Sequence, residues 1–477
     1  MRRGYTITKG ALDLLESSSS PLEMLKKAMH RLEEDKCEFM LIDENLLREV
    51  LKTSCERSLK SETVEEVREA EEEAPVRLDN RLLREWRIGG SSQDFHKYFM
   101  SRYEKLSKIL RSRLSGVIDI RSAMKLREGR EAHIVAMLLE KRETGKAWIL
   151  RVDDPTAEFK IIVPKVLESG EDPATLLPDS VFGARISRNG GSLIAREIVL
   201  PDVAAEQQVK DRYSSYVCLI SDMHLGSKYF RDDLFESFLD WINRGRDSEA
   251  KRVRFIMIAG DLVDGVGVYP GQHKELEIFS VEEQFRKLSR LLSEVPEHVK
   301  IIAGPGNHDP VQKPLPQPPI HKKYQHLLEA SGRRFIFIGN PAWINLGSRA
   351  FLVYHGQGLD DLIQNIPGLS YSSLSKNMGR LLTVLMKHRH LCPIYGENTP
   401  ILPLEEDLLV MDKIPSVFHS GHVHVAYAGS YRGVKLVNSG TWQEQTSYQR
   451  SLGLEPTVGV MSLVNLEDLS VKIRRFM

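Results

Sequence analysis

Five short apolar runs in the second half of the chain each end directly in a motif rich in histidine, aspartate, asparagine or glycine. Apolar runs ended by Gly, Asp or Asn are typical of buried strands. The carboxyl ends of such strands lie at one edge of a layered α/β sheet, where these sheets bind ligands. The ordered set of five motifs, each after a buried strand, therefore predicts one polar site. The runs and motifs are 217–220 before Asp222-Met223-His224, 255–258 before Gly260-Asp261, 299–303 before Gly306-Asn307-His308-Asp309, 351–354 before His355-Gly356, and 416–418 before Gly421-His422-Val423-His424.

Seven residues of these motifs predict a centre for two metal ions. Asp261 follows a glycine that permits a tight bend, and its carboxylate is expected to bridge the ions. Asp222 and His224 stand two apart, expected on an extended segment with both side chains on one side, and would hold one ion with His424. The mixed ligand set favours manganese, iron or zinc over magnesium, with manganese preferred. The second ion would be held by Asn307, His355 and His422.

The motifs together predict a two-metal site that hydrolyses phosphoesters, and His308 is predicted to act on the phosphate of the substrate. Its neighbour Asn307 places it beside the ions, and its ring is expected to donate a hydrogen bond to the phosphate or the leaving oxygen. Supporting a ligand is the alternative role. Water or hydroxide between the ions is the expected nucleophile. Asp264 and Asp309 are expected to be turn or supporting residues. The histidines without ligand spacing are expected at the surface: His273, His298, His321, His326, His388 and His390.

Bulk properties exclude several classes of protein. A length of 477 residues predicts two to four domains. Lysine plus arginine and aspartate plus glutamate each total 66, so any attraction to nucleic acid must come from local patches. The four cysteines have no zinc-like spacing, which indicates a reducing setting. The N-terminus lacks the apolar core of a signal peptide, and no apolar run is long enough to span a membrane. A soluble, cytoplasmic protein is therefore expected.

The pattern of residues changes along the chain. Leucines at helical spacing occupy 8–57, and seven glutamates between Glu62 and Glu73 predict a flexible linker. A helix is expected to begin near Ser91 or Ser92. Five short strands between 134 and 199 predict a small barrel of the oligonucleotide-binding type. Five prolines between 310 and 319 predict a stiff loop beside the site.

Basic residues are concentrated between Lys97 and Arg130. This segment could hold a nucleic-acid backbone or be an ordinary solvated helix face. It contains ten basic residues, at 97, 102, 105, 108, 111, 113, 121, 125, 127 and 130, against acids at 104, 119 and 128.

The ordered motifs resemble those of the calcineurin-like metallophosphoesterases. Their setting is similar to that of the small subunits of archaeal D-family DNA polymerases, which share the helical start, the acidic linker and the barrel. The closer resemblance also rests on Pro316-Gln317-Pro318, on Tyr354-His355-Gly356 with Asp360-Asp361, on Tyr431-Arg432-Gly433 and on the segment from Asn438 to Gln443.

This resemblance implies an α/β fold in four regions. They are a helical N-terminal domain (1–58), an acidic flexible linker (59–90), a helix with an oligonucleotide-binding-type barrel (91–205), and a layered β-sandwich metallophosphoesterase domain (206–477).

The resemblance also implies a proofreading 3′ to 5′ DNA exonuclease that uses two divalent ions, manganese being expected. Its partners would be the large catalytic subunit of the polymerase in a heterodimer, DNA 3′ ends and the sliding clamp. Every ligand position carries a suitable residue, which implies that catalysis is retained. Two alternatives remain: a catalytically silent scaffold subunit, and a stand-alone phosphoesterase acting on small substrates.

Overall fold

The computed structural model describes residues 6–16, 25, 28, 41, 42, 47, 74–79, 81, 88–205, 210–244 and 247–477. The chain divides into two compact units, 1–72 and 73–477. In the first unit, β1 (Thr6–Ile7) pairs in parallel with β2 (Leu41–Ile42), and α1 (Lys9–Glu16) contributes Ala11 and Leu15 to a small core. Most of the predicted helical domain and acidic linker lies outside the described residues, so the four domain boundaries stay predictions.

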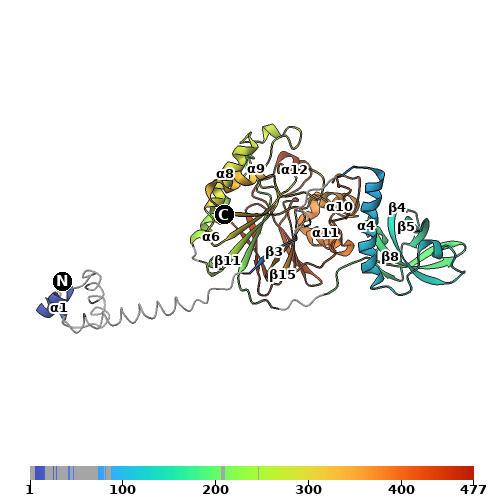
Figure 1. Cartoon of the computed structure of the whole chain (residues 1–477), viewed down its shortest axis with the longest axis horizontal. Coiled ribbons are helices and arrows are strands. Elements are labelled where there is room, and N and C mark those ends of the chain that lie inside the picture. The colour runs from blue at the N-terminus through green and yellow to red at the C-terminus, as the bar shows by residue number, and fades with distance from the viewer. Residues whose placement is uncertain are drawn as a thin grey trace. The chain divides into compact units, whose positions relative to one another are not determined.

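The second unit is built around two six-stranded sheets packed face to face. The first has the order β13-β12-β11-β10-β19-β20 and the second the order β17-β18-β16-β15-β14-β3. Figure 1 shows β11 and β15 in adjacent layers. The strands of the first sheet are β10 (Tyr216–Ile220), β11 (Val253–Ala259), β12 (Lys300–Gly304), β13 (Phe335–Phe337), β19 (Val460–Asn465) and β20 (Val471–Arg475). Those of the second are β3 (Val76–Leu78), β14 (Ala342–Leu346), β15 (Arg349–Tyr354), β16 (Val417–Ser420), β17 (Tyr427–Tyr431) and β18 (Val434–Asn438).

Alternate residues of the central strands reach two different cores. In β10, Val217 and Leu219 join the core between the sheets, where they meet Phe351 and Val417 of the second sheet. Cys218 and Ile220 point the other way, to the core under the helices. A strand buried on both faces reads as a continuous apolar run, which is why the sequence shows no alternation here.

Helices cover the outer faces of both sheets (Figure 1). Phe235, Phe238 and Ile242 follow one face of α6 and pack on the first sheet, beside Phe285 and Leu288 of α8. The helices on this side are α6 (Asp232–Arg244), α7 (Ser248–Lys251), α8 (Val281–Ser293) and α9 (Lys322–Leu328). On the second sheet lie α10 (Leu359–Asn365) and α11 (Leu374–His388), while α12 (Ser447–Ser451) is a short helix near the C-terminus. Short 3-10 turns lie at 173–175, 272–274, 329–331 and 371–373.

The five predicted motif-bearing strands all exist, but they do not share one sheet. β10, β11 and β12 are parallel neighbours in the first sheet, and β15 and β16 are parallel neighbours in the second. The expectation of a single sheet edge is therefore wrong in this detail. The site lies instead at the carboxyl ends of strands from both layers of a β-sandwich. Apolar patterning identifies buried strands, whereas their pairing depends on contacts between distant segments.

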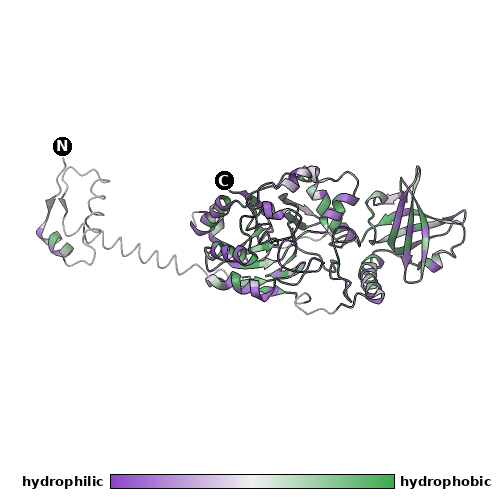
Figure 2. Ribbon diagram, turned by 90° about the horizontal axis from the view of Figure 1, so that it is seen from above, coloured by the Kyte–Doolittle hydropathy of each residue, from purple (hydrophilic) through white to green (hydrophobic). Residues whose placement is uncertain are grey.

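The prediction of a small five-stranded barrel is confirmed, while its oligonucleotide-binding type stays a prediction. Its strands are β4 (Glu131–Glu143), β5 (Ala147–Asp154), β6 (Ala157–Pro164), β8 (Val181–Asn189) and β9 (Ser192–Val199), and the parallel pairing of β6 with β9 closes it. The two-residue strand β7 (Ser169–Gly170) pairs in parallel with β9, and α5 (Ile120–Ala123) packs against the barrel. Hydrophilic and hydrophobic residues alternate along these strands in Figure 2, because only one face of each points into the barrel core.

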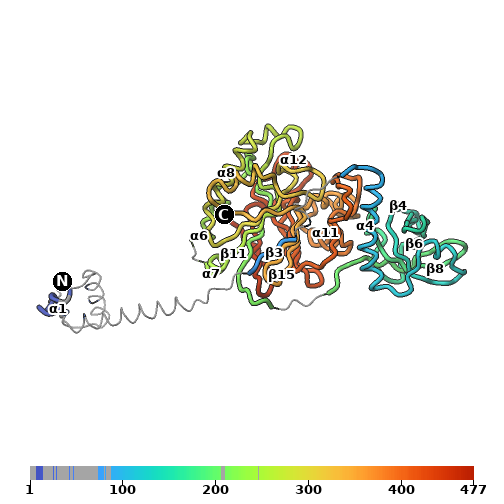
Figure 3. The backbone as a smooth tube through the Cα atoms, viewed as in Figure 1, coloured from blue at the N-terminus to red at the C-terminus, as the bar shows by residue number. Residues whose placement is uncertain are grey.

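Helix α4 (Ser92–Arg111) lies between the barrel and the sandwich (Figure 3). It begins as predicted, with a capping box between Ser91 and Asp94. Tyr103, Leu106 and Leu110 pack against barrel residues, whereas Tyr98 joins the core over the second sheet. The helix therefore fastens the barrel to the sandwich.

The basic segment from Lys97 to Arg130 is used partly for this packing. Arg102 is fully buried against Asp407, and Lys105 pairs with Glu406. His390 is also buried, with Nε2 donating to Asp407 Oδ2 at 2.9 Å. The expectation that His388 and His390 lie at the surface is therefore wrong, since both are buried. A buried histidine whose partners are remote in sequence has no local signature.

Strand β3 corrects part of the predicted linker. Val76, Arg77 and Leu78 pair with β14 at the edge of the second sheet, and Ala74 is buried in the core between the sheets. The described end of the predicted linker is thus a sheet strand.

No helix in the described part of the chain has the length and apolar character needed to cross a membrane.

Candidate metal centre

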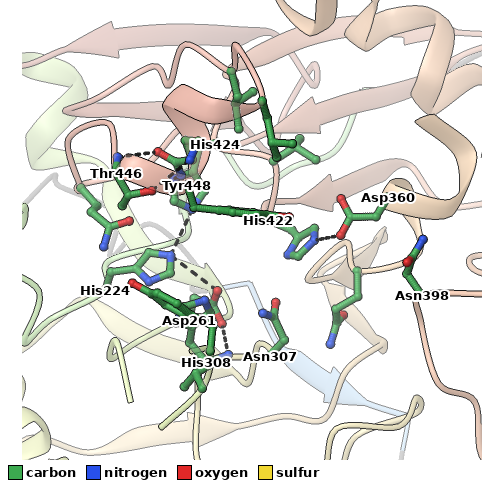
Figure 4. Close-up of a pocket in the computed structure, with 18 of the residues that line it drawn as sticks. His224, Asp261, Asn307, His308, Asp360, Asn398, His422, His424, Thr446 and Tyr448 are labelled. Atoms are coloured by element: carbon green, nitrogen blue, oxygen red, sulfur yellow. Dashed lines mark hydrogen bonds and ion pairs between the residues drawn. The ribbon is translucent and has the colours of Figure 1, made fainter. Parts of the chain in front are cut away.

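All seven predicted ligands lie together at the carboxyl ends of β10, β11, β12, β15 and β16. Five of them line a cavity of about 670 Å³, and the other two, Asp222 and His355, are buried beside it. Figure 4 shows the five that line the cavity, His224, Asp261, Asn307, His422 and His424, facing one another from separate loops. Among the described residues, three groups of side chains are placed so that they could hold a metal ion: Asp222, His224 and His424; His224, Asp261 and His308; and Asp261, His355 and His422.

The first group fits one cation. Nε2 of His424 lies 3.0 Å from Nε2 of His224 and 3.4 Å from Oδ1 of Asp222. Oδ1 of Asp222 is buried without any hydrogen-bond partner. A buried carboxylate oxygen without a partner is costly, and a cation between it and the two rings would satisfy it. The donors present therefore fit a metal ion.

The third group, together with Asn307, fits another cation. Nε2 of His355 lies 2.9 Å from Oδ1 of Asn307 and 3.3 Å from Oδ2 of Asp261. His422 donates through Nε2 to Asp360, at 2.8 Å, which leaves its Nδ1 for the centre. Imidazole, amide oxygen and carboxylate are all found in the ligand sets of divalent transition metals.

Asp261 stands between the two groups. Its Oδ2 lies 3.5 Å from Nε2 of His224 and 3.3 Å from Nε2 of His355, and its Oδ1 accepts the backbone N–H of His308 at 2.8 Å. Burial alone would raise the pKa of Asp261, but His355, His308 and His224 together hold it far below its usual value. A buried, ionised carboxylate facing both groups is the arrangement that a bridging ligand requires.

Each ring is held from behind by a second contact. His224 donates through Nδ1 to Asp264 at 3.0 Å, and His355 donates through Nδ1 to the carbonyl oxygen of Ala259 at 2.7 Å. The side-chain amide of Gln449 lies 2.8 Å from Nδ1 of His424. Such contacts orient metal-binding imidazoles. The sequence assigned no role at the site to Asp360, which entered only through the family resemblance, or to Gln449, which stands outside the motifs.

The backbone of the site is strained. Asp222, His224, Asp261, His422 and His424 all have positive φ, between 49° and 69°, where residues other than glycine are rare. Asp222 and His224 therefore do not lie on an extended segment, and that reason for their convergence is wrong; His422 and His424 are likewise not extended. Turns after β10 and β16 bring each pair round to the centre. Strain of this kind persists only where surrounding structure enforces it.

Two motif glycines allow close approach rather than unusual backbone angles. A Cβ atom on Gly306 would overlap Oδ1 of Asp261, and one on Gly421 would overlap the carboxylate of Asp222. Neither position has positive φ. The glycines are therefore needed because the loops from different strands touch where the carboxylates lie.

The remaining motif residues occupy supporting positions. His308 lines the cavity, and its Nδ1 donates to the carbonyl oxygen of Asp264 at 2.9 Å. Burial lowers the pKa of His308 to about 4, so the free ring is neutral and Nε2 is left as an acceptor. Asp309 accepts backbone N–H groups of Gly306, Leu262 and Val263, as expected of a turn residue.

Metal binding to this site should strengthen as pH rises. Burial opposes protonation of His355, but Asp261 raises its pKa to about 9. The metal-free ring is therefore an imidazolium cation, protonated on both nitrogens, at neutral pH. A cation must displace that proton, and each displaced proton makes the apparent affinity rise about tenfold per pH unit below the pKa. Calorimetric titration with Mn²⁺ between about pH 6 and pH 9, in buffers of different ionisation enthalpy, measures both quantities. An affinity independent of pH, with no proton release, would contradict this protonation state.

Comparisons with known proteins agree with the sequence patterns. Residues 217–428 match a family model that describes the B subunit of DNA polymerases alpha and epsilon. The DNA polymerase II small subunit of Methanothermobacter thermautotrophicus is 33% identical over 480 residues, covering 97% of this chain and 96% of that protein. The protein of the same name from Archaeoglobus fulgidus is 38% identical over 390 residues, covering 81% and 78%.

Other matches are less complete. The DNA polymerase II small subunit of Pyrococcus furiosus is 38% identical over 383 residues, covering 78% of this chain but 62% of that protein. The chain thus spans less than two thirds of the length of the Pyrococcus relatives. Among solved structures, the phosphoesterase Yfce from E. coli aligns at 16% identity with a TM-score of 0.27, over 55% of this chain and 100% of that one, and supports no inference.

Proposed function

Because the chain belongs to the DNA polymerase II small-subunit family of archaea, we propose that it is the subunit that removes nucleotides from DNA 3′ ends for proofreading. The reaction proposed is hydrolysis of a phosphodiester with two divalent ions. The observation that carries the proposal is the position of Asp261, ionised and 3.5 and 3.3 Å from ring nitrogens of the two ligand groups. A subunit with a purely scaffolding role has no need of such a centre.

The side chains present suit this chemistry. Two divalent ions held here would acidify a water molecule and neutralise charge developing on the phosphate. Asp261 would hold both ions, and the supporting contacts of Asp264, Ala259 and Asp360 would fix the rings that complete each shell. The combination of carboxylate, amide oxygen and imidazole favours manganese.

His308 is proposed to contact the phosphate or the leaving oxygen. Its Nδ1 is committed to Asp264, which leaves Nε2 for the substrate. The neutral ring becomes a donor when the negative charge of the bound phosphate raises its pKa. Lys313 also lines the cavity, with Nζ donating to the carbonyl oxygen of Asn307 at 2.9 Å, and would neutralise phosphate charge.

The partners follow from the family. Relatives are named as small subunits, and a small subunit implies a large catalytic subunit with which this chain would form a heterodimer. DNA 3′ ends and the sliding clamp are the other proposed partners. The regions proposed for these roles are the barrel within 91–205 and the phosphoesterase domain within 206–477.

Digestion of single-stranded DNA labelled at its 5′ end tests the proposed activity. The purified chain with Mn²⁺ should produce a descending ladder of labelled products, because nucleotides leave from the unlabelled 3′ end. The same DNA labelled at its 3′ end should release the label at once. The assay is run with and without the large subunit. No cleavage in either case would favour the scaffold, and cleavage of small chromogenic diesters alone would favour a stand-alone phosphodiesterase.

A further inference from the structure

The cavity has two unlike walls. One wall carries Asp261 and Asn307 together with His308 and Lys313, and is suited to a phosphate. The other is largely apolar and aromatic, and comes from the 3-10 turn at 371–373, from Val423 in the loop after β16, from α12 and from the segment that follows α12. It is formed by Tyr371, Val423, Tyr448, Leu452 and Leu454.

The second wall is a built part of the core rather than a loose loop. Leu454 and Val423 are buried, and Leu452 and Tyr371 pack against the same core cluster over the second sheet. The hydroxyl of Tyr371 donates to Asp360, which in turn accepts from His422. The apolar wall is therefore connected directly to the candidate metal centre.

Tyr448 stands out on this wall because its side chain is 64% exposed although it lines the cavity. Among the described residues, its ring has no stacking partner and its hydroxyl no hydrogen bond. Its neighbours are held firmly, since Ser447 donates through Oγ to Glu275 and the amide of Gln449 contacts His424. A ring that is exposed at the cavity, between two anchored neighbours, is available to a ligand.

We propose that Tyr448 is a stacking platform for the base of the unpaired terminal nucleotide whose phosphodiester lies at the metal centre. This inference rests on the proposed function and names the part of the substrate that the second wall takes. Figure 4 shows Tyr448 on the same side of the cavity as His424 and across from Asp261 and Asn307. A nucleotide has an anionic part and a flat aromatic part, and the two walls match them.

Stacking suits a site that must accept every base. Each base has a π-face, and stacking on an aromatic side chain contributes about 1–3 kcal/mol per base without selecting its sequence. The cavity volume of about 670 Å³ lies within the range of sites for small ligands. The site is thus suited to the end of a single strand.

The test compares Tyr448→Leu and Tyr448→Phe with the wild type on two oligonucleotides. One ends in an ordinary 3′ nucleotide and the other in an abasic 3′ residue. Tyr448→Leu should raise KM for the ordinary end by about 5- to 150-fold, which is the stacking contribution expressed as a ratio. It should leave KM for the abasic end unchanged, and Tyr448→Phe should behave as the wild type does. Phe279→Leu is the matched control, because Phe279 is 63% exposed but does not line the cavity.

A binding measurement separates this inference from the proposed activity. An oligonucleotide with 2-aminopurine at its 3′ end and a phosphorothioate as its last linkage reports stacking as loss of fluorescence without turnover. Quenching by the wild type and by Tyr448→Phe, but not by Tyr448→Leu, supports the platform even if no DNA is cleaved. Equal quenching by all three proteins would overturn it. An equal rise in KM for ordinary and abasic ends in Tyr448→Leu would overturn it too. Cleavage with no dependence on Tyr448 would leave the exonuclease intact and remove only the platform.

Discussion

Replacing Asp261 with asparagine is expected to lower the rate of metal-dependent DNA cleavage by at least about 10³-fold. Loss of a single group that stabilises a transition-state charge costs about 10²–10³-fold, and Asp261 faces both ligand groups. The asparagine keeps the oxygen that accepts the His308 N–H but places an amide group where the second carboxylate oxygen stood. Mn²⁺ bound per chain, counted by elemental analysis, and the rate of 5′-labelled DNA digestion check the prediction together.

Asp360→Asn is the graded control for this experiment. Asp360 contacts the ring of His422 from behind, and its amide would keep an acceptor for Nε2 while removing the charge. Loss of such a supporting contact typically costs about 10–100-fold in metal affinity or activity. Circular dichroism should show both variants folded. Wild-type cleavage by Asp261→Asn would remove Asp261 from the proposed centre, and equal effects of the two variants would deny it a bridging role.

Replacing Arg102 with methionine should lower the free energy of unfolding by about 3–5 kcal/mol, because it leaves a buried charge without its partner. Arg102 and Asp407 are both 0% exposed, and Arg102 Nε donates to Asp407 Oδ2 at 2.8 Å. The guanidinium also donates to the carbonyl oxygens of Pro393 and Asp179, which it joins to α4. Burial alone would raise the pKa of Asp407, but His390 and Arg102 hold it well below its usual value. Denaturation by guanidinium chloride measures the loss.

A second substitution distinguishes an unpaired charge from lost packing. The double variant Arg102→Met with Asp407→Asn should recover a large part of the stability, because no buried charge remains. Lys108→Met, at an exposed position of the same helix, should change stability by no more than about 0.5 kcal/mol. If Arg102→Met were as stable as Lys108→Met, the ion pair would not be what fastens α4 to the sandwich.

The candidate ligands could be predicted because each stands directly after a buried strand. Asp222, Asp261 and His355 follow apolar runs that are visible in the sequence and that form β10, β11 and β15. The barrel and the start of α4 at Ser92 were open to the same reasoning, since period, turn residues and caps are local signals. Their role as ligands stays a prediction.

The supporting residues could not be found in this way. Gln449 contacts His424 from a helix that follows the last motif, and Asp360 reaches His422 across 62 positions. His390 and Arg102 owe their burial to Asp407, which lies 17 and 305 positions away from them. Pairs of this kind carry no periodicity, so only the folded chain identifies them.

The sequence by itself determined which side chains are candidate cation ligands and which segments are buried strands, because side-chain chemistry and apolar periodicity are local properties. Only the tertiary structure decided that these strands belong to two sheets, that Asp222, His224, His422 and His424 turn inward through positive φ, and that an exposed Tyr448 stands on the wall opposite Asp261. The physical reason is that sheet pairing, enforced backbone strain and the shape of a cavity arise from contacts between segments far apart in the chain, which no short stretch of sequence contains.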